Sequence, residues 1–394
     1  MLLLIFIAVC LINSNVSVKS GLRTYVKVIH IAVFAMCLVV YMFVKKRLDK
    51  KTENKKLICL YKYMYLGVLV LVSRIGLFYL FKSRKVLAIL PSFGEGLGSY
   101  INYGMSILLN NAMYANIIIN TVLTFIIVVL IKKLMFKITS SDFLSTLSAV
   151  LCIMLPFSMY NVTYYDKFTY NLVFTLLGLN LIIKIIDEVK QYKLKTNNYV
   201  YMSILLGFVI SIDILFKGSY IFWATIILVI IPAASYIDVF HLSFGGKMKF
   251  KKIICKIEQL NISKLVKVAA YSMLMSGIVK IILTILSAGR YHANFINENY
   301  FESIKGALML SRNYYILLIV VILTFEIIGI VLKRKIDIKM TVIKLFNIMS
   351  VLYIILNGTA CILFDVSLIL LAVCNICNIY YNREEKIKLL KDKN

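Results

Sequence analysis

The sequence predicts an all-α polytopic membrane protein with about 12 transmembrane helices, and three observations lead to this fold class. The chain of 394 residues is 61% hydrophobic and only 16% charged, whereas soluble domains are about 45–50% apolar and about 25% charged. The mean hydropathy is +0.89. Long apolar segments alternate with short lysine-rich ones, which is the pattern of membrane spans joined by loops.

A span needs about 17–25 mostly apolar residues to cross the hydrocarbon core. The candidate spans are 2–19, 24–44, 63–81, 115–131, 143–159, 168–186, 199–216, 219–237, 265–287, 313–332, 341–356 and 361–381. The first is weak, because its apolar run ends near Ile12. We expect one integral membrane domain over 1–394, with two extra helices and a basic loop in 1–62, a helical bundle in 63–381 and a basic tail in 382–394.

The distribution of lysine and arginine predicts the orientation. With the N-terminus inside, the inner loops carry about three times as many Lys and Arg residues as the outer segments, in agreement with the positive-inside rule. We therefore expect a multi-pass protein of the plasma membrane with both termini cytoplasmic. The net charge of +27 is interpreted as contact with anionic membrane lipids. A nucleic-acid partner is not expected, because no basic helix or RNA-binding motif accompanies the charge.

The eight cysteines do not predict a disulfide framework, because none of them falls in a predicted outer segment. Cys374 and Cys377 have the CxxC spacing of a zinc or redox site. Their position inside an apolar helix favours simple packing.

The stretch 91–104, PSFGEGLGSYINYG, is the first sizeable segment too polar and glycine-rich to cross a bilayer. It carries Glu95 among three alternating glycines, which permit sharp backbone bends. The following segment, YINYGMSILLNNAMY, has an apolar face with Ile101, Met105 and Leu108, so we expect a helix that lies in the membrane interface. We interpret the stretch as an active-site loop, or the relic of one, at the outer face.

These features stand in an order that resembles the GT-C superfamily of polytopic glycosyltransferases, particularly the bacterial mannosyltransferase-like and lipid A arabinosyltransferase-like members. Arg74 in VLVSRIGLF resembles a buried arginine of that family, and Tyr100 and Tyr103 resemble its first outer loop. The segment LPFSMYNVTYYDKFTYNLVF, with Tyr165 and Asp166, resembles its later outer turn. The resemblance covers roughly 63–381 and implies a GT-C-like bundle with an interfacial helix in the first large outer loop.

The chain also departs from the family pattern. The family's catalytic aspartate would fall near Gly96, where only the adjacent Glu95 could substitute. Lys217 and Gly218 replace an Arg-Pro pair, the last loop lacks an Arg-Tyr pair, and the large soluble C-terminal domain of some relatives is absent. These departures allow a chain that kept the fold and lost the chemistry.

The resemblance implies transfer of a sugar from a polyprenyl-phosphate donor to an envelope glycan, lipid or protein acceptor on the outer face. Such a reaction needs a general base for the acceptor hydroxyl and cations for the departing phosphate. Glu95 and Asp166 are the catalytic candidates. The substrate-binding candidates are Arg74, Arg84, Lys85, Tyr100, Tyr103, Tyr165, Lys217 and Arg290. No cofactor is certain, and any metal would be held by hard oxygen ligands, which suits Mg²⁺ or Mn²⁺.

Each candidate has a structural alternative. Glu95 fits equally well as a solvated loop carboxylate, and Asp166 as the N-cap of the helix that follows it. Arg74 could form an internal ion pair with Asp213 or Glu326, and Lys217 could extend its ammonium to the interface. For the whole protein, the alternatives to a glycosyltransferase are a lipid-linked oligosaccharide flippase or small-solute transporter, and a catalytically inactive GT-C relative.

Overall fold

The computed structural model describes residues 39, 43, 46, 61–71, 73–74, 96–153, 165–190, 198–216, 223, 262–286, 319–320, 322–328, 338–357 and 362–391. All regular secondary structure in this part of the chain is α-helical, which confirms the all-α prediction there. Its long helices overlap the predicted spans, and most of their ends fall within a few residues of the predicted ones.

The elements with defined bounds are α5 (Leu97–Leu108), α6 (Ala112–Thr139), α7 (Asp142–Ile153), α9 (Lys167–Lys190), α10 (Asn198–Leu215), α14 (Ile262–Leu286), α17 (Ile338–Asn357) and α18 (Ile362–Lys391). A shorter helical segment covers Tyr61–Leu71. Within the described residues, Ala112–Thr139 and Lys167–Asp187 are long and apolar enough to cross a membrane. The count of about 12 spans stays a prediction.

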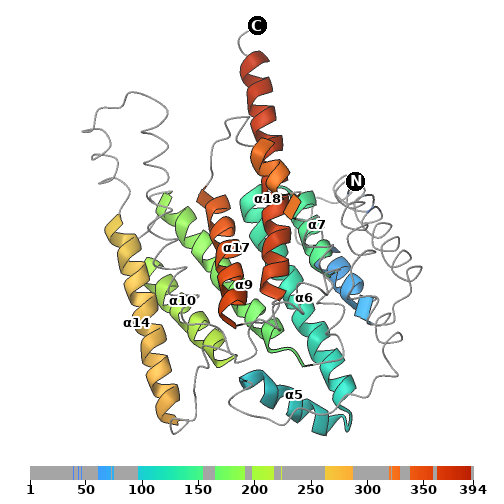
Figure 1. Ribbon diagram of the computed structural model, residues 1–394, viewed down its shortest axis with the longest axis vertical. Helices are drawn as coiled ribbons and strands as arrows, with labels where there is room; N and C mark the ends of the chain where they lie inside the picture. The colour runs from blue at the N-terminus through green and yellow to red at the C-terminus, as the bar shows by residue number, and fades with distance from the viewer. Residues whose placement is uncertain are drawn as a thin grey trace.

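The helices form a bundle in which α6 contacts α5, α7, α9 and α18. The helix α10 packs between α9 and α14, and α17 packs against α18. Figure 1 shows α5 lying across one end of this bundle, at the bottom of the view. The core is mainly apolar but also buries polar side chains, Asp365 and Asn375 of α18 among them. Every described side chain of α18 from Ile362 to Cys377 is buried except that of Ile376.

Lysines from segments far apart in the sequence meet at one end of the bundle, which we call the lysine end. The Lys137 ammonium donates to the carbonyl oxygen of Asn180 at 3.0 Å, and Lys339 donates to the carbonyl oxygen of Lys137 at 3.0 Å. Lys339 also forms an ion pair of 2.8 Å with Asp187. The C-terminal parts of α6 and α9 and the start of α17 thus lie together.

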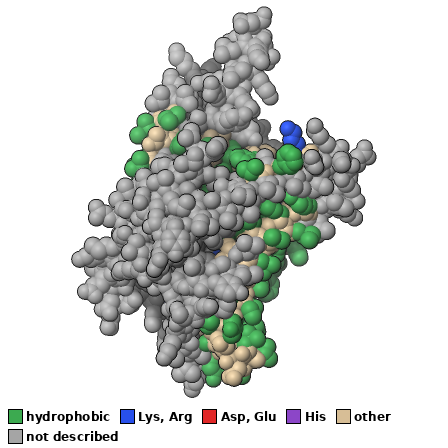
Figure 2. Space-filling view, turned by 90° about the vertical axis from the view of Figure 1, so that its right-hand side faces the viewer, with side chains coloured by type: hydrophobic (Ala, Val, Ile, Leu, Met, Phe, Trp, Pro, Cys, Tyr) green, Lys and Arg blue, Asp and Glu red, His purple; other side chains and the backbone are tan. Residues whose placement is uncertain are grey.

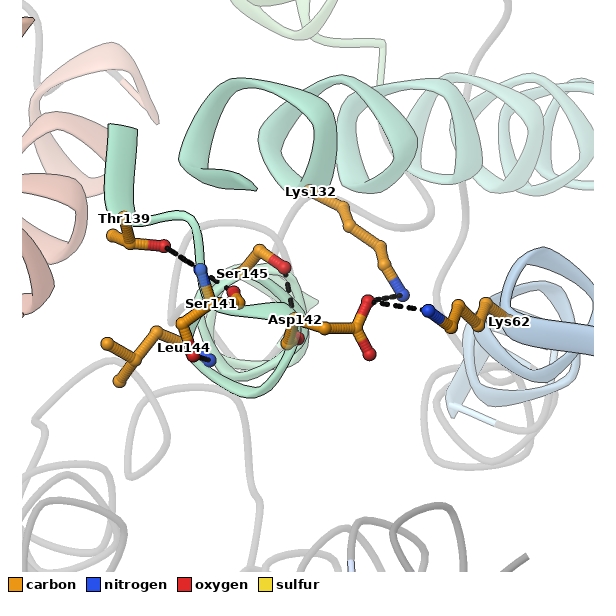
Figure 3. A network of polar contacts seen from close by, with 7 residues as sticks. All are labelled: Lys62, Lys132, Thr139, Ser141, Asp142, Leu144 and Ser145. Atoms are coloured by element: carbon orange, nitrogen blue, oxygen red, sulfur yellow. Dashed lines mark hydrogen bonds and ion pairs between the residues drawn. The ribbon is translucent and has the colours of Figure 1, made fainter. Parts of the chain in front are cut away.

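A second charged group of the lysine end joins α6 and α7 to the Tyr61–Leu71 segment (Figure 3). The Asp142 carboxylate lies 3.1 Å from the Lys62 ammonium and 3.8 Å from that of the buried Lys132. The chain reverses between the helices at Ser140, whose φ is 52°. Ser141 then caps α7, because its hydroxyl accepts from the amide of Leu144 at 3.4 Å.

Small residues bring α10 and α14 close together. A Cβ added to Gly207 would lie 2.7 Å from the Met275 Cβ and 2.9 Å from the Ser272 carbonyl oxygen. The Ser272 hydroxyl in turn donates to the carbonyl oxygen of Ser203 at 3.1 Å. Close backbone approach with serine hydrogen bonds is the packing mode of helices in lipid.

Exposed apolar side chains form stripes along the outside of the bundle. On α6 the stripe comprises Tyr114, Ile118, Val122 and Ile126, all at least 37% exposed and spaced four residues apart. Similar stripes run along α10 and α14, with Tyr201 69% exposed and Ile285 71% exposed. Figure 2 shows one face with a band of hydrophobic side chains that continues to the end where α5 lies.

Candidate functional site

The candidate site lies at the opposite end of the bundle, which we call the α5 end because α5 covers it. The helix begins after Gly96, whose φ of 79° belongs to a region that side-chain-bearing residues rarely adopt. The hydroxyl and the amide of Ser99 both donate to the Gly96 carbonyl oxygen, at 2.8 and 3.1 Å. One of the predicted glycine bends is thus present in the backbone.

The polar side of α5 faces the bundle and its apolar side faces outward. Its buried residues are Gly98, Ser99, Asn102 and Ser106. By contrast, Ile101 is 42% exposed, Ile107 63% and Leu108 76%. The prediction of an amphipathic helix is therefore confirmed for 97–108. Met105, which was predicted to share the apolar face of Ile101 and Leu108, packs against a cluster that contains Tyr170 and Phe216.

Asn102 joins three helices at the α5 end. Its amide donates to the Asn116 side-chain oxygen of α6 at 2.6 Å, and its own side-chain oxygen accepts from the Tyr170 hydroxyl of α9. The Tyr170 ring stacks on Phe216, just after α10, with the ring centroids 5.1 Å apart. This node lies in the interior, since Asn102, Asn116 and Tyr170 are each 5% exposed.

Gly98 lets the start of α5 approach the start of α9. A Cβ at this position would lie 2.9 Å from the Tyr165 hydroxyl and 3.0 Å from the Tyr170 ring. Tyr165 directly precedes Asp166, and Gly98 lies three residues after Glu95. Two of the predicted outer segments are therefore in contact.

Asp166 caps α9, as its structural alternative predicted. One carboxylate oxygen accepts from the Phe168 amide at 3.1 Å and the other from the Thr169 hydroxyl at 2.8 Å. These are the contacts of an N-cap carboxylate, which stabilises the positive end of a helix. Both carboxylate oxygens of Asp166 therefore take part in the cap.

Arg74 lies in the interior, 2% exposed. Its guanidinium donates to the Thr124 hydroxyl at 2.9 Å, and that hydroxyl donates to the Asn120 carbonyl oxygen at 2.6 Å. Asp213 and Glu326 were the alternative ion-pair partners predicted for Arg74, and both have other partners. Asp213 accepts from the Trp223 indole at 2.6 Å, and Glu326 pairs with Lys344 at 2.9 Å.

A small pocket surrounds Arg74. Its polar lining includes Asn120, Thr124 and Thr169, and its other walls come from α6, α7, α9 and α18. About 20 Å³ is open to the centres of water molecules, which is room for one or two waters. Thr169 connects this pocket to Asp166 through the hydrogen bond described above.

The structure thus brings together Arg74, Tyr165 and Asp166 around Thr169 and Tyr170. Tyr100 lies on the same α5 helix but is 38% exposed, and Tyr103 is half-buried and contributes its carbonyl oxygen to Ser106 at 2.7 Å. The remaining predicted site residues, Glu95, Arg84, Lys85, Lys217 and Arg290, lie outside the described residues.

Asn102, Thr124 and Tyr170 were not among the predicted site residues. One signal was present in the sequence, because Asn116, Asn120 and Thr124 recur every four residues within an apolar span and must share one helix face. The partner helices of that face could not be read from the spacing.

The described residues contain no group of three or more His, Cys, Asp or Glu side chains that could hold a metal ion. Of the two predicted catalytic acids, Asp166 belongs to the described residues and Glu95 does not. Cys374 and Cys377 are buried and form no disulfide.

No protein-family model, curated protein or solved structure matches this chain. Assignment of a function therefore depends on the residues and their geometry.

Proposed function

We propose that the chain is a polytopic membrane glycosyltransferase-like protein that transfers a sugar from a polyprenyl-phosphate donor to an envelope acceptor at the α5 end. Embedding in lipid is supported by two apolar helices of sufficient length, by the exposed apolar stripes and by the close α10–α14 packing. The α5 end is then the outer face, because the lysines gather at the other end.

The observation that carries the proposal is the contact of Gly98 with Tyr165 and Tyr170. It places the segment that follows Glu95 against the segment that carries Asp166. A sugar transferase needs its acid or base beside the groups that hold the substrate, within hydrogen-bond reach of the reacting hydroxyl. Under this proposal, the segments of Gly98 and Tyr165, which are more than 60 residues apart in the sequence, together provide the base and the substrate-binding groups.

In the proposed reaction, a carboxylate of Glu95 or Asp166 takes the proton of the acceptor hydroxyl. The acceptor oxygen forms the new bond to the anomeric carbon while the bond from that carbon to the lipid phosphate oxygen breaks. The phosphate leaves with the bonding electrons, and cationic side chains among the substrate-binding candidates stabilise its charge. General-base assistance of this kind contributes about 10²–10⁴-fold to the rate.

Asp166→Asn separates the catalytic role of Asp166 from its cap. Asparagine caps a helix about as well as aspartate, so the fold is retained while the proton acceptor is lost. We expect Asp166→Asn or Glu95→Gln to lower sugar transfer by about 10²-fold or more, measured with purified protein and a panel of polyprenyl-phosphate sugars.

Asp187→Asn, at the lysine end, is the matched control and should transfer at the wild-type rate. Transfer by the wild-type chain with full activity in both Asp166→Asn and Glu95→Gln would refute the catalytic assignment. No transfer by the wild-type chain with any donor of the panel would refute the proposed function itself.

A further inference from the structure

A buried polar column runs inward from α5 along α6. Asn116, Asn120 and Thr124 are each 5–6% exposed and lie on one face of the helix, which at 1.5 Å per residue gives a column about 12 Å long. Asn102 meets its outer end at Asn116, and Arg74 meets its inner end at Thr124. Such polar side chains are costly in an apolar helix unless they are hydrogen-bonded, and in membrane helices they face either a neighbouring helix or a polar path.

The column is closed in the observed conformation. The pocket beside Arg74 admits only water, and α5 covers the outer end. Two hydrogen bonds of Asn102, to Asn116 and from Tyr170, hold the cover in place. Apart from Met105, the large apolar side chains of α5 described above are exposed.

The connection between α5 and α6 has the form of a hinge. It consists of residues 109–111, and Asn110 adopts a φ of 48°. Asn111 begins α6 independently, because its side chain accepts from the amides of Met113 and Tyr114 at 2.9 and 3.2 Å. The start of α6 therefore keeps its own cap when α5 changes its angle.

We propose that α5 is a hinged cover and that Asn102 is its latch, so that polar groups reach the column and the Arg74 pocket only when Asn102 releases Asn116 and Tyr170. The polar head of a lipid-linked sugar is the group that would enter. That identification depends on the proposed function, whereas the latch itself does not.

Cys152 is a native reporter for this opening. It is buried, forms no disulfide and lines the Arg74 pocket. Cys374 and Cys377 are also buried and form no disulfide, but they do not line this pocket. The full-length protein in lipid nanodiscs is treated with 2-aminoethyl methanethiosulfonate, and the modification of each cysteine is followed by peptide mass spectrometry.

In the wild-type chain we expect Cys152 to be protected. Asn102→Ala removes both latch hydrogen bonds and should raise the rate of Cys152 modification about tenfold, with Cys374 and Cys377 unchanged. Tyr170→Phe removes one of the two bonds while keeping the ring and should give a smaller increase. Ile107→Ala, on the same helix but with an exposed side chain outside the latch, is the control and should match the wild type.

The latch is refuted if Cys152 reacts at the wild-type rate in both latch variants. It is also refuted if Cys152, Cys374 and Cys377 accelerate together in both, since that pattern indicates general loosening. This measurement does not require sugar transfer. If the latch variants raise the rate of Cys152 modification in a chain that transfers no sugar, the latch is supported and only the proposed function is refuted.

Discussion

At the scale of single residues, the polar side chains buried between apolar helices have the largest influence on how the helices pack. Asn102, Arg74 and Asp213 each have a specific hydrogen-bond partner on another part of the chain. A buried polar group without a partner costs about 1–3 kcal/mol. Such groups therefore fix which helices meet and in which register.

The ion pairs of Asp142 give a prediction at this scale. Asp142→Asn removes the countercharge of Lys132, whose side chain is only 6% exposed, so we expect the free energy of unfolding to fall by about 1–3 kcal/mol. The measurement is denaturation in a fixed detergent.

Asp187→Asn is the control for that prediction. Its side chain is 32% exposed, and pairs exposed to solvent contribute about 0–1 kcal/mol. If the free energy of unfolding falls equally in Asp142→Asn and Asp187→Asn, the burial of Lys132 does not determine the effect of losing its ion pair.

At the scale of elements, apolar run length predicted the existence of the helices well and their ends less well. The predicted span 115–131 is a helix from Ala112 to Thr139, because lysines at a helix C-terminus continue the helix favourably. The boundary between α5 and α6 comes from the cap of Asn111 and the φ of Asn110. No apolar pattern encodes those two features.

The contact between α10 and α14 gives a prediction for this scale. Gly207→Ala should lower the melting temperature, because the added methyl meets the Ser272 backbone oxygen and the Met275 Cβ. Overpacking of this kind costs about 1–3 kcal/mol.

Gly277→Ala on α14 is the matched control, because a Cβ there meets nothing within 4 Å. Both variants gain the same helix propensity, about 1 kcal/mol, so the difference between them measures the clash. If the two variants melt alike, the close approach of α10 and α14 is wrong.

At the scale of the whole molecule, the exposed apolar stripes predict that lipid surrounds the bundle. Val122 lies in the middle of the α6 stripe and is 53% exposed. Val122→Lys should place a charge in the hydrocarbon at a cost of about 2.5–3.5 kcal/mol, and we expect less protein to be integrated into membranes after alkaline extraction.

Phe136→Lys is the companion variant. Phe136 is 50% exposed and lies near the lysine end, where a lysine can extend its ammonium to the interface, so integration should stay near the wild-type level. Equal integration of the Val122 and Phe136 variants would contradict a lipid-facing α6 stripe.

The sequence by itself determined the helical class, the approximate positions of the long helices and the polar character of the segments between them. It could do so because apolar run length and charge are local properties of the chain. It also predicted the amphipathic helix that became α5 and the cap at Asp166.

Only the tertiary structure decided which polar residues meet. The contacts of Asn102 with Asn116 and Tyr170, of Gly98 with Tyr165, and of Arg74 with Thr124 join helices that are distant in sequence. Helix spacing places a residue on a face but does not say which helix covers that face. That choice is made by packing and by the energetic advantage of pairing buried polar groups.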